Sequence, residues 1–157
     1  MEMRFEKEVV DKDPNASSIH DANGGWGRGS RIVGDRMGQV KEACVNSGKN
    51  VVFLCHSAIR QHQAVDMSPY NILTLNLSKN ALPHFVDLVD CVGFLRLKVY
   101  DHRGGKEKVV LSTSSRELIC HAHATITSKN RLKINKPLDC PEGSNPIVDY
   151  IKANMKG

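Results

Sequence analysis

One apolar run constrains the fold of this chain more than any other stretch of its sequence. Residues 51–55 (Val-Val-Phe-Leu-Cys) contain no polar break, and His56 and Ser57 follow them directly. A short, unbroken apolar run of this kind is typical of a strand that is buried on both faces of a sheet. In open α/β sheets, ligands bind just beyond the carboxyl ends of such strands. The sequence therefore predicts a buried strand that delivers His56 and Ser57 to the functional edge of an α/β sheet.

The composition narrows the class of protein without fixing its function. The chain has 157 residues, of which 40% are hydrophobic, and this is enough for one domain with an aliphatic core. Its formal net charge of +5 permits contact with nucleic acid but does not require it. The charged first residues predict no signal peptide, and no stretch approaches the roughly 20 apolar residues that span a bilayer. Five cysteines without a CxxC pair favour a reducing cytoplasm, with Cys55 and Cys91 as small core residues.

The remaining elements follow from hydrophobic periodicity. Residues 1–30 show little apolar pattern, so we expect a short charged helix and a flexible glycine-rich loop ahead of a domain over residues 31–157. An apolar stripe predicts a helix from residue 31 to Gly48, and with the run at 51–55 it forms the second half of a βαβ unit. Beyond it we expect a strand at 71–77, a helix from Asn80, antiparallel strands at 92–100 and 108–113 joined by a turn at 101–106, a strand at 118–124 and a terminal helix at 145–155.

Three short motifs each allow two interpretations. Gly24 and Gly29 have the spacing of a phosphate loop, but Ser30 stands where lysine is required, so an ordinary flexible loop competes. Residues 120–123 (Cys-His-Ala-His) place two histidines on one face of a strand, but a structural zinc site needs four ligands and we assign no metal. The pair Cys55–His56 suggests a nucleophile and its base, yet adjacent strand residues point to opposite faces.

The order of these pieces resembles the C-terminal half of the RecA-like phage nucleotide-binding proteins, which are P-loop ATPases linked to DNA recombination and single-strand annealing. The similarity covers about residues 31–137 and depends most on the strand ending in His-Ser and on the Lys-Asn-Arg segment at 129–131. The helix within residues 76–90 and the strand at 94–101 match in order. The resemblance implies an α/β fold: an incomplete RecA-like P-loop NTPase sheet with flanking helices and a C-terminal β-hairpin.

The same resemblance implies roles for particular residues. His56, with Ser57, would be a polar sensor that couples the state of the γ-phosphate to the loop beyond it. Lys129 and Arg131 would be trans-acting basic residues that neutralise charge on ATP held by a neighbouring subunit. The loop at 58–70 would contact single-stranded DNA, with three candidate residues: Arg60, Gln61 and His62.

The chain departs from the family pattern at the phosphate site. It has no GK[ST] sequence and no apolar strand ending in aspartate, so the Walker A lysine and the Walker B aspartate, expected upstream, are missing. We therefore expect ATP and Mg²⁺ to be bound only with a Walker-A-containing partner or in a homo-oligomer, and whether the chain is an enzyme stays open. Two alternatives remain. One is a non-catalytic single-stranded-DNA-binding module that uses the basic segment at 129–136, and the other is an interaction protein without a ligand.

Overall fold

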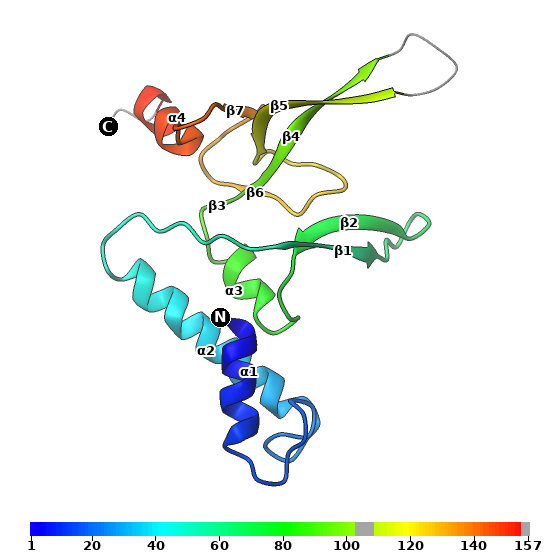
Figure 1. Ribbon diagram of the computed structural model, residues 1–157, viewed down its shortest axis with the longest axis vertical. Coiled ribbons are helices and arrows are strands. Elements are labelled where there is room, and N and C mark those ends of the chain that lie inside the picture. Colours follow the sequence, from blue (N-terminus) through cyan, green and yellow to red (C-terminus); the bar gives the residue numbers. More distant parts are fainter. Residues whose placement is uncertain (103–108, 155–157) are drawn as a thin grey trace. The chain divides into compact units, whose positions relative to one another are not determined.

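A computed structural model describes the backbone of residues 1–102 and 109–154, and the side chains of residues 1–98 and 114–154. These residues belong to two compact units, unit 1 over Met1–Val89 and unit 2 over Asp90–Gly157. The described residues form four helices and three small sheets, which confirms the mixed α/β class (Figure 1). The predicted division of the chain at residue 30 stays a prediction.

Helices form most of the core of unit 1. They are α1 (Glu2–Asp11), α2 (Arg28–Val45) and α3 (Leu82–Val86), so the predicted lead helix and the predicted helix from residue 31 are both confirmed. Val33 of α2 packs with Val9 of α1, while one turn further along α2 Met37 packs with Phe85 of α3. The i, i+4 spacing of the two α2 residues thus places one helix against two partners.

The first turn of α1 is tied to a distant part of the same unit. Both carboxylate oxygens of Glu2 accept a hydrogen bond from the backbone N–H of Ser78, at 3.0 and 3.2 Å. The Ser78 hydroxyl in turn accepts a bond from the N–H of Ala81, the residue that precedes α3. Asn80, predicted as the N-cap of this helix, is not its cap: Ala81 is the N-cap and α3 begins at Leu82, with the Ser78 side chain bonded just ahead of it.

The predicted buried strand at residues 51–55 is wrong. Residues 51–56 belong to neither a helix nor a strand, and the side chains of Val52 and Leu54 are 71% and 94% exposed. Phe53 alone turns inward, where its ring meets Phe85 edge to face at a centroid distance of 5.2 Å. An apolar run becomes a doubly buried strand only where neighbouring strands pair with its backbone and other layers cover both faces. None of the strands formed by the described residues pairs with this run.

Strand structure in unit 1 begins only after the run. β1 (Ser57–His62) and β2 (Tyr70–Leu75) form an antiparallel hairpin in which Ser57 lies opposite Leu75 and His62 lies opposite Tyr70. The strand predicted at 71–77 is confirmed as β2. The loop predicted at 58–70 is wrong in its first part, because residues 58–62 form β1 and only 63–69 connect the two strands.

Unit 2 contains the other two sheets and the last helix. β3 (Cys91–Val92) pairs with β6 (Lys129–Asn130). In the other sheet, β5 (Val109–Ile119) lies between β4 (Phe94–His102) and β7 (Leu138–Cys140), and all pairings are antiparallel. The helix α4 (Pro146–Asn154) follows. The predicted C-terminal hairpin is confirmed as β4–β5, although residues 103–106 of its predicted turn lie outside the described residues. The strand predicted at 118–124 is wrong beyond Ile119, where β5 ends.

All pairings between the described strands are antiparallel. The parallel βαβ arrangement expected for the RecA-like sheet is therefore not formed by residues 1–102 and 109–154, while the mixed α/β architecture remains compatible with part of an AAA-type fold. Within the described part of the chain, no helix combines the length and the apolarity that crossing a bilayer requires.

Candidate functional site

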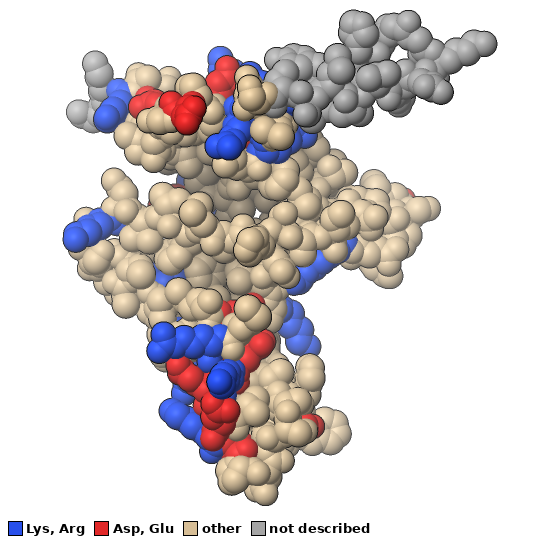
Figure 2. Space-filling view, in the orientation of Figure 1, with Lys and Arg blue, Asp and Glu red and all other residues tan. Residues whose placement is uncertain are grey.

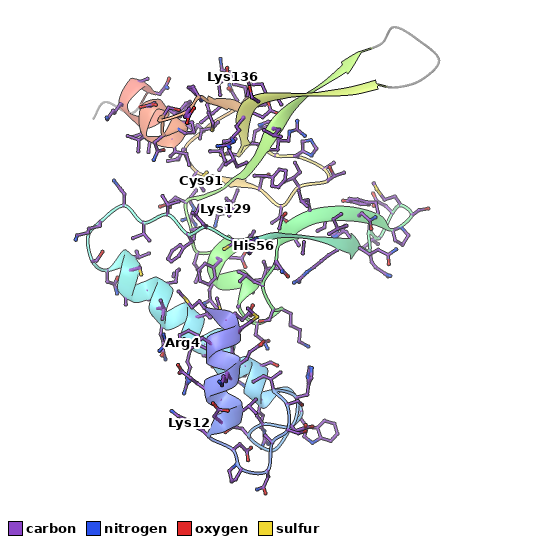
Figure 3. All side chains as sticks on the ribbon, viewed as in Figure 1. Arg4, Lys12, His56, Cys91, Lys129 and Lys136 are labelled. Carbon is purple, nitrogen blue, oxygen red and sulfur yellow. The ribbon has the colours of Figure 1, made fainter. Side chains whose placement is uncertain are left out.

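His56 and Ser57 lie at the start of a strand and not at the end of one. Both side chains are exposed, and Ser57 opens β1 opposite Leu75. The backbone carbonyl of His56 accepts a hydrogen bond of 2.8 Å from the N–H of Asn76, which extends the hairpin by one residue. The backbone of His56 is thus held by the residue that follows β2, while its side chain is exposed next to the run at 51–55 (Figure 3).

The three predicted DNA-contacting residues lie next to each other on β1 but differ in their surroundings. The Arg60 guanidinium donates a hydrogen bond to the carbonyl of Leu77, so this cation supports the end of the hairpin. His62 packs against the Tyr70 ring across the hairpin, at a centroid distance of 5.3 Å. Gln61 is exposed and faces the opposite side from its two neighbours. Gln61 and His62 are both exposed, and of the two only His62 is engaged in a ring contact.

Lys129 and Arg131 belong to unit 2, whereas the other candidates belong to unit 1. Lys129 lies in β6 opposite Val92, and the backbone N–H of Arg131 donates to the carbonyl of Asp90 at 2.9 Å. The Arg131 guanidinium also contacts the Asp90 carboxylate at 3.1 Å, with the two side chains 59% and 77% exposed. An ion pair this exposed contributes about 0–1 kcal/mol, so breaking the Arg131–Asp90 contact costs little.

The short loop after β6 is held in shape by Asn130. Its side-chain oxygen accepts a hydrogen bond of 3.1 Å from the N–H of Ile134, and its amide nitrogen donates to the carbonyl of the same residue. Ile134 is buried, and Lys133 between them has a φ of 58°, which closes the loop. The asparagine in the Lys-Asn-Arg segment therefore has a structural role, and it presents the basic residues on both sides of it on an ordered turn.

The glycine-rich motif does not form a phosphate loop. Turns rather than a strand precede it, and Gly29 lies within α2, where an added Cβ would be 2.5 Å from the Ile19 carbonyl oxygen. The geometry that cradles phosphate requires a loop between a strand and a helix. Of the two readings of this segment, the structure favours the one without a phosphate site.

The residues around His121 also differ from the strand that was predicted. His121 and His123 follow the end of β5, and their rings are 6.5 Å apart. Within the described side chains, no group of three or more histidine, cysteine or acidic residues is placed to hold a metal ion.

The cysteines are distributed differently from what the sequence indicated. Cys55 is exposed, so its prediction as a core residue is wrong, while Cys91 is half-buried and Cys120 fully buried. Although Cys55 is exposed, the protein around it removes part of the water from its thiol, and this partial desolvation raises the pKa of Cys55. Cys91 and Cys120 are hydrogen-bonded to each other, a contact that sequence reasoning missed because nothing in the sequence relates two residues so far apart.

Comparison with known proteins identifies a family for this chain. A family model described as an AAA domain matches residues 1–132, which extends from α1 through β6. No curated protein and no solved structure matches the chain. The matched range contains every residue that the sequence singled out as a sensor, a DNA contact or a trans-acting cation.

Proposed function

Because the chain belongs to the AAA-domain family, we propose that it is the C-terminal part of a RecA-like ATP-binding protein that acts in phage DNA recombination or single-strand annealing. The family as a whole indicates a nucleotide-binding, ATPase-type role. Within that role, His56 and Ser57 sense the nucleotide, and Lys129 and Arg131 act on nucleotide held by a neighbouring subunit.

AAA domains in general use a nucleotide and Mg²⁺, but the residues of this chain do not fit these groups by themselves. No GK[ST] sequence occurs, so the lysine that grips the phosphates is missing. Among the described side chains, no cluster of acidic residues is placed to hold the metal ion. We therefore assign the phosphate-gripping residues to a second polypeptide that carries a Walker A sequence, or to a further copy in a homo-oligomer.

The exposed run at residues 51–55 carries this proposal. Its β-branched and apolar sequence is that of a buried strand, yet Leu54 is 94% exposed. Exposed apolar segments with strand-forming sequences are typical sites of pairing with another chain. Pairing of this run with a strand of the Walker A polypeptide would bury Val52 and Leu54 and place His56 at the rim of the shared sheet.

The test is reconstitution with a polypeptide that contains a Walker A sequence, chosen from the genes adjacent to this one. We expect the two chains to co-purify and to bind a fluorescent ATP analogue that neither chain binds alone. Leu54→Asp should abolish co-purification, because it places a charge in the new sheet, while Ile59→Asp at the exposed outer side of β1 is the matched control. If no nucleotide binds with any such partner, the chain has no ATPase role.

A second candidate function is a non-catalytic module that binds single-stranded DNA. The basic segment of unit 2 favours it, since Lys133 and Lys136 are exposed there; Lys136 is labelled in Figure 3. In unit 1, by contrast, acidic and basic side chains interleave over α1 and α2 (Figure 2), where Glu8 contacts Arg4 and Arg36 at 3.1 and 3.5 Å. Opposite charges so close to each other offer little attraction to a phosphate backbone.

Salt dependence of binding to an oligo-dT strand tests this second function. Each phosphate contact on a single strand contributes about −0.7 to the slope of log K against log salt concentration. We expect the double variant Lys133→Ala/Lys136→Ala to flatten that slope by about 1.4. Lys7→Ala, a variant at an exposed position of α1, should leave it unchanged. An affinity that does not respond to salt would argue against DNA binding. If neither nucleotide nor DNA shifts the melting temperature, the chain is an interaction protein without a ligand.

A further inference from the structure

Two thiols of unit 2 lie close enough to interact, and a third is near them. Cys91 lies in β3, Cys120 directly follows β5, and the Cys120 thiol is hydrogen-bonded to the Cys91 sulfur. The strand register explains the contact: Phe94 of β4 lies opposite Ile119, which brings the chain just before β4 alongside the chain just after β5. The negative charge of an ionised Cys140 would reach Cys120 as well.

A glycine makes room for this contact. A Cβ added at Gly93 would lie 2.9 Å from the Cys120 sulfur, closer than real Cβ contacts allow. The missing side chain lets the sulfur sit against the backbone between Cys91 and β4. Cys120 is fully buried, whereas Cys91 is half-buried, so a small reagent reaches the pair from the Cys91 side.

The two thiols differ in their electrostatics. The hydrogen bond from Cys120 lowers the pKa of Cys91, against the opposing effects of burial and of the nearby Asp90 carboxylate. The same hydrogen bond and burial raise the pKa of Cys120. Cys91 is thus the member that ionises and Cys120 the member that keeps its proton, which is the division of roles between an attacking thiolate and a resolving thiol.

We propose that Cys91 and Cys120 form an oxidation site at which a hydroperoxide closes a disulfide between β3 and the end of β5. The Cys91 thiolate attacks the peroxide oxygen, the O–O bond breaks, and the sulfur becomes a sulfenic acid while hydroxide, or the alkoxide of an organic hydroperoxide, leaves. The Cys120 sulfur then attacks the Cys91 sulfur, the S–O bond breaks, and water leaves with the Cys120 proton. The two sulfurs together lose two electrons, and one peroxide bond is reduced.

The site is placed to affect the basic segment of unit 2. Cys91 lies opposite Asn130 in the β3–β6 pairing, and its neighbour Asp90 contacts Arg131 through both backbone and side chain. A disulfide at Cys91 would fix β3 to the end of β5 and so hold the strand against which β6 is paired. The oxidation site does not depend on the proposed ATPase or DNA-binding roles.

Peptide mapping of the full chain tests the site, because trypsin places each of the five cysteines in a different peptide. The reduced chain is treated with stoichiometric hydrogen peroxide, free thiols are blocked by alkylation, and the digest is analysed without reduction. We expect peptide 80–96 joined to peptide 117–129, with the pair lighter by two hydrogen atoms and restored by dithiothreitol. Cys91→Ser and Cys120→Ser should each abolish the linked species, whereas Cys44→Ser, which removes a thiol of unit 1, should preserve it.

Several outcomes would overturn the proposal. The first is a disulfide from peptide 117–129 to peptide 134–152, which contains Cys140. The second is a disulfide through the peptides of Cys44 or Cys55 that forms before the link between 80–96 and 117–129. The third is oxidation of Cys91 to sulfinic acid while Cys120 stays a free thiol. The wild-type map alone distinguishes these results, so the test holds even if a serine variant fails to fold.

Discussion

The exposed position of Leu54 can be tested by its effect on stability. A fully buried leucine side chain is worth about 1.5–3 kcal/mol in transfer free energy. Since Leu54 is 94% exposed, Leu54→Ala should change the free energy of unfolding by only about 0.1–0.2 kcal/mol. If residues 51–55 instead formed a strand buried within the isolated chain, the same substitution would cost about 2–5 kcal/mol. The two arrangements differ by more than tenfold in the expected effect.

Urea unfolding followed by far-ultraviolet circular dichroism measures this difference. Phe85→Ala serves as the positive control, because Phe85 is 5% exposed and packs edge to face on Phe53. It should cost about 3–5 kcal/mol. A loss above about 1 kcal/mol for Leu54→Ala would refute the exposed arrangement. A loss of less than about 1 kcal/mol for Phe85→Ala would contradict the burial of Phe85 in the core of unit 1.

Three further substitutions or reactions test other parts of the chain. Gly38→Ala should lower the free energy of unfolding by about 1 kcal/mol in chemical denaturation, because the new Cβ would lie 2.7 Å from the His84 ring. This crowding outweighs the gain from the higher helix propensity of alanine. A gain in stability would contradict the α2–α3 packing. Asn130→Ala should cost about 2 kcal/mol by the same measurement, since it leaves the N–H and carbonyl of buried Ile134 without their partner; a neutral effect would show that the loop holds itself. The rate at which iodoacetamide alkylates Cys91 should reach its maximum at a lower pH than the rate for a cysteine in a short peptide, because the lowered pKa of Cys91 keeps the reactive thiolate present as the pH falls. The opposite order would show that burial outweighs the hydrogen bond from Cys120.

Periodicity in the sequence predicted the elements whose partners are local. The apolar stripe between residue 31 and Gly48 identified α2, and the pattern of the strands predicted at 92–100 and 108–113 identified β4 and its hairpin. In these segments the side-chain pattern alone determines the period, so helix and strand can be distinguished without knowledge of the rest of the fold.

The prediction of a buried strand at residues 51–55 was wrong because its outcome depends on a partner that is not local. The apolar residues of this run indicate burial, but burial as a strand depends on a neighbour that contributes backbone partners, and no periodic pattern identifies that neighbour. β1 was missed for a related reason. Its residues Arg60, Gln61 and His62 are polar, and only the pairing with β2 makes this segment a strand. The Lys-Asn-Arg segment was recognised as a motif, but the role of Asn130 depends on a contact four residues away.

The bond between Glu2 and Ser78 has a practical consequence for handling the protein. The Glu2 carboxylate, in the first turn of α1, binds the backbone of Ser78 just ahead of α3, so these first residues are part of the packed structure of unit 1. Trimming the first helix would therefore release the connection between β2 and α3.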